Sequence, residues 1–180
     1  MTVDEFKDVD KTFNESMFIT KANNIFVKLF TAIMMDKLDE VDHFISDYVM
    51  AYAKGIVNGL KDKNQRQMYD ELNVKESKIS SIDVLDNVYE IKVYLQSRYM
   101  DYIISLDSGD TVSGNDQSRI QVDYMLTFRK KKDADTQGIV RKCPGCGATL
   151  NVNNSGKCDY CGSIYNQEDY DWVLTELKVC

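Results

Sequence analysis

Four cysteines constrain this sequence more than any other feature. Cys143 and Cys146 form one C-x-x-C pair, Cys158 and Cys161 form a second, and a glycine directly follows each pair. Two such knuckles that face each other place four thiolates at the corners of a tetrahedron, which is the geometry that Zn²⁺ prefers. Glycine suits its position because a knuckle needs a residue that tolerates positive φ. The spacing therefore predicts a closed structural zinc site in a zinc ribbon.

Other uses of these cysteines are less favoured. Two disulfides would need an oxidising compartment, and residues 1–7 lack the basic start and the apolar run of a secretory signal. A redox dithiol at 143–146 should open a helix after a strand, whereas a second cysteine pair follows here. A catalytic zinc needs an open coordination position, which four thiolates do not leave. The fifth cysteine, Cys180, is expected to be a free thiol.

A net charge of −7 limits the partners that the chain as a whole can bind. An acidic protein repels phosphates, so broad nucleic-acid binding is disfavoured. Residues 129–157 differ, because they hold seven Lys or Arg and only two Asp. No apolar stretch approaches the roughly 20 residues that a membrane-spanning helix needs. We therefore expect a cytoplasmic protein, with peripheral contact to a membrane left open, built as one domain with an insertion.

The first third of the chain has the apolar spacing of helices. Residues 1–11 open with a Thr-x-x-Glu capping box and are predicted to form an N-terminal arm or short helix. The same pattern at 12–15 precedes an apolar stripe of 3.6-residue period over 18–35, which predicts a long core helix. A short second helix over 38–45 and a third helix over 46–60 are expected to follow.

From Leu72 onward the apolar period changes from 3.6 residues to 2, which indicates strands. The expected strands are 79–85, with a bulge between Ile79 and Ile82, then 89–104, 120–129 and 170–177. Turn residues separate the first three at 86–87 and 107–110. The predicted fold class is α+β, with three N-terminal helices packed on a curved, cone-like antiparallel sheet and the ribbon inserted before the last strand.

The ribbon lies between two predicted strands and is therefore interpreted as an insertion. Both knuckles bind one metal, so the two ends of a ribbon leave close together and the flanking strands can pair. Polar segments on either side of the cysteines are typical of linkers. The expected division is a ribbon over 133–165, a cone-shaped α+β domain over 12–132 plus 166–180, and the arm over 1–11.

The order of these elements resembles the cone-shaped fold of the nuclear transport factor two superfamily. Four short stretches are similar to the C-terminal domain of the forty-four-kilodalton subunit of the mitochondrial import motor: LDEVDHFISDYV (38–49), MDY (100–102), DSGDTVSG (107–114) and YMLTFR (124–129). Bacterial members of that family often carry a cysteine ribbon before a closing Trp-Val-Leu strand, as at residues 172–174 here. The resemblance extends over about residues 12–179.

The resemblance implies a non-enzymatic domain that docks proteins or sits against a bilayer, with a hydrophobic pocket able to take an apolar chain. Members of the family typically have an upstream membrane-binding segment or spanning helix, whereas only an acidic stretch of about eleven residues precedes the fold here. The expected partners are a protein, or a lipid or other apolar ligand. The residues expected to present the ribbon surface to an acidic partner or lipid headgroup are Tyr160, Lys130, Lys131 and Lys132.

Two alternatives to a docking function stay open. The superfamily also includes isomerases and dehydratases, which use a pocket base beside tyrosine donors. The candidate pocket residues here are Tyr99, Asp101, Tyr102 and Tyr124, although Asp101 also fits a plain carboxylate at a strand end, and no catalytic residue is assigned. The second alternative is weak nucleic-acid contact through the ribbon, where lysines would meet phosphates and Tyr160 would stack on a base.

Overall fold

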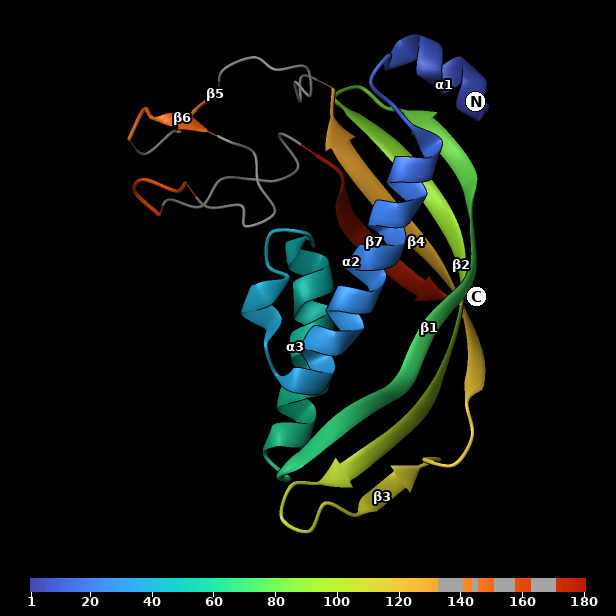
Figure 1. Ribbon diagram of the computed structural model, residues 1–180, viewed down its shortest axis with the longest axis vertical. Coiled ribbons are helices and arrows are strands. Elements are labelled where there is room, and N and C mark those ends of the chain that lie inside the picture. Colours follow the sequence, from blue (N-terminus) through green and yellow to red (C-terminus); the bar gives the residue numbers. More distant parts are fainter. Residues whose placement is uncertain (133–140, 144–145, 151–157, 163–170) are drawn as a thin grey trace.

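Helices occupy the first third of the chain, as predicted. The computed structural model describes residues 1–132, 141–143, 146–150, 158–162 and 171–180. The helical elements are α1 (Val3–Val9), α2 (Glu15–Met35), the single 3-10 turn η1 (Leu38–Glu40) and α3 (Asp47–Lys61). Figure 1 shows α2 lying across the hollow side of the sheet, with α3 beside it.

The segment predicted as a short second helix, 38–45, is helical only over η1. Its apolar residues are spaced like those of a helix, but Phe44 and Ile45 are buried against the last strand. Two backbone hydrogen bonds hold this segment beside the last strand: the Leu174 N–H donates to the Phe44 carbonyl, and the Ser46 N–H donates to the Leu174 carbonyl. Tertiary pairing therefore overrides the local helical spacing.

The helix starts follow the capping chemistry of the sequence, with one shift. At α1, the Thr2 side chain accepts from the Glu5 N–H and the Glu5 carboxylate accepts from the Thr2 N–H, which confirms the capping box. The second expected box, at 12–15, does not form. Thr12 instead donates to the Asp10 carboxylate, and Asn14 caps α2 by accepting from the Met17 N–H at 2.9 Å. An asparagine closer to the apolar stripe thus replaces the threonine as cap.

Five antiparallel strands form the main sheet. They are β1 (Gln65–Val84), β2 (Val88–Ser105), β3 (Thr111–Gly114), β4 (Ile120–Lys131) and β7 (Val173–Val179). The order across the sheet is β1-β2-β4-β7, with β3 added beside β2. A separate two-stranded sheet joins β5 (Arg141–Lys142) to β6 (Thr149–Leu150). The α+β prediction is confirmed, and the four cysteines lie before the last strand as expected.

The first strand is longer than its sequence pattern predicts. β1 begins at residue 65, not 79, and its pairing with β2 shifts register after Asp70, Val74 and Ile79. Each shift moves the side chains that follow to the other face, so a two-residue period cannot persist along the strand. The predicted bulge between Ile79 and Ile82 is the third of these shifts and is confirmed.

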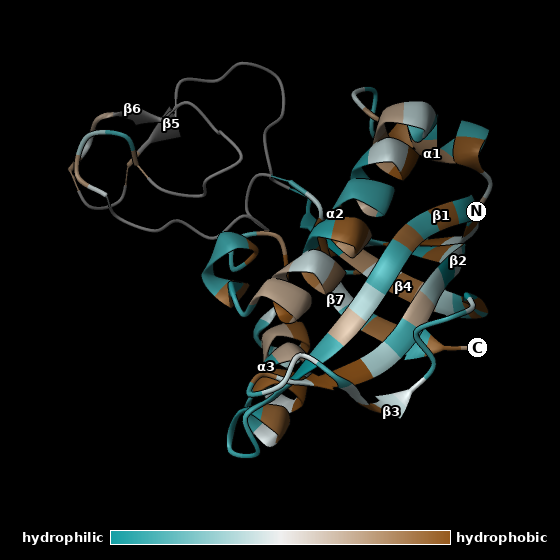
Figure 2. Ribbon diagram, turned by 60° about the horizontal axis from the view of Figure 1, so that its bottom comes forward, coloured by the Kyte–Doolittle hydropathy of each residue, from teal (hydrophilic) through white to brown (hydrophobic). Residues whose placement is uncertain are grey.

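The core lies between α2 and the hollow face of the sheet. Every second residue of β2 and β4 points to this face, including the buried Ile91, Leu95 and Phe128. Figure 2 shows the corresponding alternation of hydrophobic and hydrophilic residues along the strands. From α2, Phe26 and Phe30 pack onto the sheet and are almost fully buried. Burial of each such ring contributes about 1.5–3 kcal/mol, so this face of α2 holds the helices on the sheet.

A glycine allows β3 to approach β2 closely, and this gives a test of the fold. Gly114 has a φ of +84°, and a Cβ built there would lie 2.3 Å from the Asp101 carbonyl oxygen. We predict that Gly114→Ala lowers the free energy of unfolding by about 3 kcal/mol, from backbone strain plus overlap. The matched control is Gly109→Ala, where φ is +79° but no atom lies within 4 Å, and where we expect a loss of about 1 kcal/mol. Equal losses in chemical denaturation would contradict this explanation.

Candidate metal centre and adjoining groove

The four cysteines of the two C-x-x-C pairs come together in space. Their Sγ atoms all lie within 4.8 Å of one another. The Cys143 and Cys161 sulfurs are 3.6 Å apart, and the Cys146 and Cys158 sulfurs are 3.8 Å apart. Four sulfurs bound tetrahedrally to zinc at 2.3 Å would be separated by about 3.8 Å. The cluster is therefore able to hold a metal ion of this size.

The backbone around the cluster has the form expected of two knuckles. Gly147 has a φ of +75° and Gly162 a φ of +72°, which confirms the prediction that these positions need glycine. In each knuckle the glycine N–H donates to the carbonyl of the first cysteine, at 2.9 Å from Gly147 to Cys143 and 2.9 Å from Gly162 to Cys158. The first knuckle is closed further by β5 and β6, which pair on either side of it.

The closeness of the four sulfurs limits how many of them can be ionised without a cation. The backbone N–H of Ala148 stabilises the Cys146 thiolate, but a hydrogen bond with the Cys161 sulfur, burial, and hydrogen bonds with the sulfurs of Cys158 and Cys143 favour the thiol and together raise the pKa of Cys146 to about 12. Four sulfurs so close together cannot all carry negative charge unless a cation offsets it. Thiolates supply every position of a tetrahedral ion, so such a site would be structural.

Lys130 corrects the predicted ribbon surface. It is only 3% exposed and lies in the core, because it continues the alternation that buries Leu126 and Phe128 of β4. Its ammonium donates to the Asp10 carboxylate at 2.6 Å and lies 5.3 Å from the centre of the Trp172 ring. A buried lysine needs such a partner. Lys130 therefore joins the arm to the end of β4 through this buried ion pair and is not part of an exposed ribbon surface.

The other predicted surface residues differ in how far their side chains are exposed. Lys131 and Lys132, at and just after the end of β4, are partly buried. Tyr160 is 79% exposed at the tip of the second knuckle. The ribbon itself was expected over 133–165; its segments 133–140, 144–145, 151–157 and 163–165 lie outside the described residues. Tyr160 is thus the exposed aromatic side chain of the described knuckle residues.

Aromatic rings join α1 to the start of the last strand. Phe6 is fully buried, and its ring packs edge-on against Phe13, Tyr89 and Trp172, with centroids 4.9, 5.1 and 6.3 Å away. Phe18 of α2 contacts the same tryptophan at 5.1 Å. Edge-to-face pairs of this kind add roughly 0.5–1.5 kcal/mol each beyond their burial. The arm is therefore an integral part of the core beside the two ends of the insertion.

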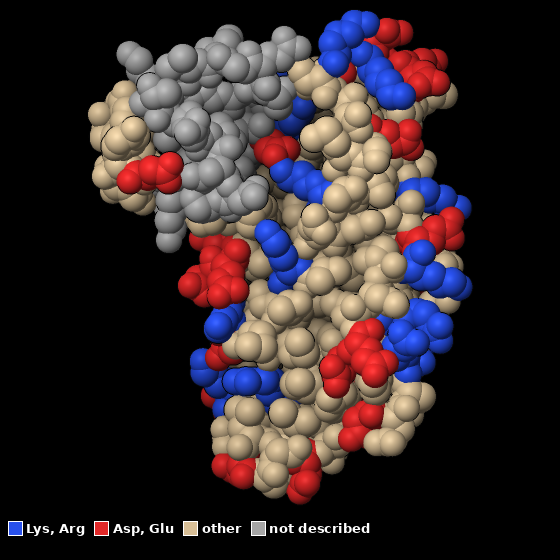
Figure 3. All heavy atoms as spheres, in the orientation of Figure 1, with Lys and Arg blue, Asp and Glu red and all other residues tan. Residues whose placement is uncertain are grey.

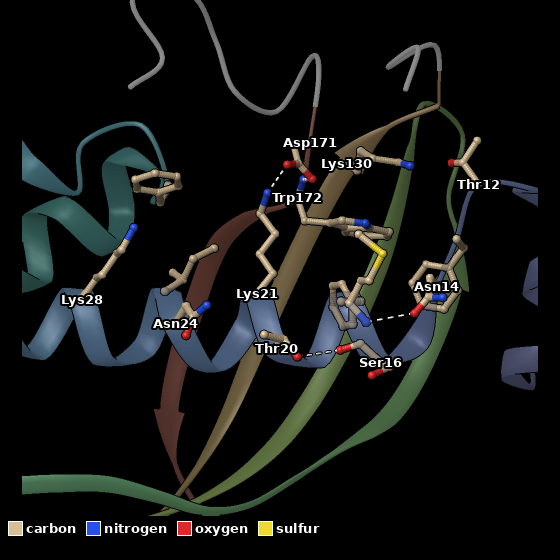
Figure 4. A pocket seen from close by; sticks show the side chains of 15 residues that line it. Thr12, Asn14, Ser16, Thr20, Lys21, Asn24, Lys28, Lys130, Asp171 and Trp172 are labelled. Carbon is tan, nitrogen blue, oxygen red and sulfur yellow. Dashed lines mark hydrogen bonds and ion pairs between the residues drawn. The ribbon is translucent and has the colours of Figure 1, made fainter. Parts of the chain in front are cut away.

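A groove of about 590 Å³ lies along α2 next to Trp172 and is called the α2 groove here. Its lining residues are Thr12, Phe13, Asn14, Ser16, Met17, Phe18, Thr20, Lys21, Asn24, Ile25, Lys28, Phe44, Lys130, Asp171 and Trp172. The aromatic members and Ile25 are buried, whereas α2 presents hydroxyl, amide and ammonium groups along one side (Figure 4). Met17 is 73% exposed at the rim.

Two lysines of α2 line the groove in different settings. Lys21 reaches across to pair with Asp171, just before Trp172 (Figure 4). Lys28 places its ammonium 4.9 Å from the centre of the Phe44 ring. Over the described part of the face in Figure 3, basic and acidic side chains are interspersed. The α2 groove therefore combines apolar lining with ammonium groups.

The candidate pocket residues do not line the α2 groove. Tyr99 and Tyr124 are buried in the core with their hydroxyl oxygens 2.7 Å apart, and burial is the main cause that raises the pKa of each. Asp101 is exposed and accepts from the Gln67 amide at 2.6 Å. The Tyr102 hydroxyl donates to the Asp70 carboxylate and not to Asp101. The structure thus brings the two tyrosine hydroxyls together inside the core and leaves the Asp101 carboxylate exposed.

Sequence reasoning missed the residues that build the groove and its border. Asp10 was placed in an arm, and neither Lys21 nor Asp171 was singled out. One signal was present: extending the alternation of β4 by one step puts Lys130 on the buried face. The partner of that lysine was not visible, because Asp10 is 120 residues away in sequence. Contacts across such separations leave no local pattern.

Comparison with known proteins gives a family match. A family model described as the Tim44-like domain matches residues 1–138. The crystal structure of the intermembrane space region of the chloroplast protein ARC6 is similar over 99% of this chain and 96% of that chain, with 8% sequence identity and a TM-score of 0.45. No curated protein matches the sequence. In the part of the chain that the structure describes, no helix is both long and apolar enough to cross a bilayer.

Loss of one thiolate tests the link between the cysteine cluster and the sheet. We predict that Cys146→Ser removes the bound metal and lowers the hydrogen-exchange protection of residues 173–177, because metal binding supplies on the order of 10 kcal/mol to a small module of this kind. The matched control is Cys180→Ser, which should keep both metal and protection because this thiol is exposed and outside the cluster. Unchanged protection in Cys146→Ser would show that the last strand pairs independently of the cluster.

The buried ion pair predicts a pH dependence of stability. Burial raises the pKa of Asp10, but hydrogen bonds from Lys130 and Thr12 and the charge of Lys130 outweigh it, so the pKa is lowered. A lowered folded-state pKa gives stability that is complete above the ordinary aspartate pKa and lost as pH falls through the folded value. We predict that Asp10→Asn costs about 3–5 kcal/mol in the free energy of unfolding at neutral pH, because Lys130 is left buried and unpaired.

Urea denaturation of wild type and Asp10→Asn between neutral and acid pH checks this. The difference between the two proteins should shrink as the pH falls below the ordinary aspartate pKa. The double variant Asp10→Asn with Lys130→Met should recover part of the loss, since no charge is then left unpaired. A constant difference at all pH values would contradict the role given to the ion pair.

Proposed function

Because the chain belongs to the Tim44-like domain family, we propose that it is a non-enzymatic interaction module that docks a protein partner in the α2 groove, supported by a structural zinc ribbon. The observation that carries the proposal is the groove itself. Its volume of about 590 Å³ falls within the range of ligand-binding clefts. The family match covers the helices and most of the sheet, which include most of the residues that line this groove.

The chemistry of the groove favours a segment with an apolar side chain and a carboxylate. Phe13, Phe18 and Trp172 form an aromatic floor that is itself at most 9% exposed, and Met17, 73% exposed, supplies an accessible apolar side chain at the rim. Lys28 has its ammonium over a ring and is positioned to meet an acidic group at the edge. An acidic and apolar peptide segment satisfies both. A lipid offers the same pair of properties and is the competing ligand in the test below.

The four thiolates are proposed to hold one zinc ion in a closed site. Zinc is favoured over other metals because four soft sulfur ligands in tetrahedral arrangement suit it and leave no position for water. The ribbon is proposed to span 133–165 and to form a rigid insertion in a domain made of 12–132 and 166–180. The arm, 1–11, packs on that domain. Tyr160, 79% exposed at a knuckle tip, is proposed as its contact residue.

The setting of the candidate pocket residues supports docking over catalysis. The hydroxyl groups of Tyr99 and Tyr124 form a hydrogen bond with each other inside the core. Asp101 is exposed and hydrogen-bonded to an amide. General acid–base chemistry needs a donor and a base that converge on a substrate with tuned protonation. These residues support the stability of the aromatic core and give no such convergence.

Two exposed methionines at opposite ends of α2 give a matched test. Met17 lines the α2 groove and Met35 does not. We predict that the anionic aromatic dye 8-anilinonaphthalene-1-sulfonate binds the native full chain, and that Met17→Glu weakens this binding about tenfold through charge repulsion and lost apolar contact. Met35→Glu should leave the dye affinity unchanged. Equal effects of the two substitutions in a fluorescence titration would refute the assignment of the groove.

The class of partner is tested by photocrosslinking in cells. A benzoylphenylalanine at position 17 should form adducts with protein, and the same residue at position 35 should give none of those adducts. Adducts with lipid alone would contradict protein docking while leaving the groove as the binding site. Absence of any adduct specific to position 17 would contradict docking in the groove altogether.

A further inference from the structure

Asp171 is the single carboxylate among the described residues that line the α2 groove. It lies just before Trp172, at the point where the chain re-enters the sheet. Its Oδ1 atom accepts from the Trp172 N–H at 2.7 Å, and its Oδ2 atom pairs with the Lys21 ammonium (Figure 4). The first contact orients the carboxylate, and the second connects it to α2. The groove thus already holds a carboxylate of the chain itself.

The three lysines that line the groove have three different settings. Lys130 is buried and pairs with Asp10, which is not a lining residue. Lys21 pairs with Asp171. Lys28 has its ammonium over an aromatic ring and, within the part of the chain that the structure describes, forms no ion pair. An incoming anion therefore meets Lys21 only by replacing Asp171, whereas it meets Lys28 without displacing a carboxylate.

Distance along α2 decides which ammonium a compact ligand meets. Met17, the accessible apolar side chain at the rim, is about 6 Å along the helix axis from Lys21 and about 16 Å from Lys28. Asp171 is next to Trp172 of the aromatic floor, so its ion pair adjoins the apolar part of the groove. A carboxylate directly beside an apolar group of the ligand therefore reaches Lys21, and Lys28 is left to groups farther along an extended segment.

The Lys21–Asp171 pair is accessible enough to be exchanged. The two side chains are 28% and 33% exposed. Ion pairs this accessible contribute little to stability, because water solvates both groups when they separate. In an exchange the Lys21 ammonium ends with a carboxylate partner again, and Asp171 moves into water. No charge is left buried and unpaired, in contrast to what would follow from opening the buried pair of Lys130 with Asp10.

We propose that Asp171 is an internal competitor in the α2 groove, and that a carboxylate of the docked protein segment binds Lys21 in exchange for it. This inference rests on the proposed function and specifies how the docking site is regulated. While it is paired with Lys21, Asp171 repels ligand anions from the aromatic floor. Once it is exchanged, the chain just before β7 is released from α2. Docking in the groove is thereby coupled to this contact.

Two dyes that differ only in charge test the exchange. The anionic dye is 8-anilinonaphthalene-1-sulfonate, and the neutral dye, N-phenyl-1-naphthylamine, is the same molecule without the sulfonate. In fluorescence titrations of the full chain, Asp171→Asn should strengthen binding of the anionic dye about fivefold and leave the neutral dye unchanged, because Lys21 then meets the sulfonate without a competitor. The matched control is Asp36→Asn, which removes the carboxylate of the Lys61–Asp36 pair outside the groove and should change neither affinity.

Further variants identify the ammonium that binds the anion. In the Asp171→Asn background, Lys21→Met should cancel the gain for the anionic dye, whereas Lys28→Met, which removes the same charge, should leave most of it. Lys21→Met in the otherwise wild-type chain is a test that does not need Asp171→Asn, and it should weaken only the anionic dye. Equal effects of the two lysine substitutions overturn the proposal. Near-ultraviolet circular dichroism of Trp172, the single tryptophan, checks that each variant is folded.

The outcomes separate the exchange from the docking function. If the wild type binds both dyes in a way that depends on Met17, and Asp171→Asn changes both affinities equally or not at all, the ion pair is purely structural. The exchange is then refuted and the docking function stands. If neither dye binds the wild type, the docking function fails and the exchange fails with it.

Discussion

The pairing of β4 with β7 is the constraint on which the other features of this protein depend. Arg129 lies opposite Val173 and Phe128 opposite Leu174, so the chain leaves the sheet and re-enters it at neighbouring points. The segment between β4 and β7 must therefore begin and end at neighbouring points of the sheet. A cluster that brings Cys143 within 4.8 Å of Cys161 satisfies this requirement, because it closes the insertion on itself. The cysteine cluster and the pairing of β4 with β7 thus meet the same requirement.

The same two strand ends organise the surface around them. Lys130, at the end of β4, is held by Asp10, and Trp172, at the start of β7, is packed by rings from both α1 and α2. Asp171 is held in turn by Lys21. The α2 groove lies among these contacts, so its shape is set by the elements that fix the ends of the insertion. A partner in the α2 groove would therefore contact residues next to the ends of the insertion.

Much of this architecture is predictable from the sequence, and the exceptions have physical causes. The fold class, the long helix and the cysteine cluster follow from local periodicity and spacing, which short windows record well. The sequence does not reveal the full extent of β1, because three register shifts interrupt its two-residue period. The segment 38–45 was predicted to be a helix, but its pairing with β7 overrides its helical spacing. The partner of Lys130 and the α2 groove depend on contacts between residues far apart in sequence, and no local pattern records them.

The central claim is that one metal ion, bound by four sulfurs, closes the insertion between the last two strands of the sheet. X-ray absorption spectroscopy at the zinc edge, on the full chain purified under reducing conditions, measures this directly. The account predicts one zinc per chain with four sulfur neighbours at about 2.3 Å. A protein without stoichiometric zinc, or zinc bound by nitrogen or oxygen in place of any of the four sulfurs, would contradict it.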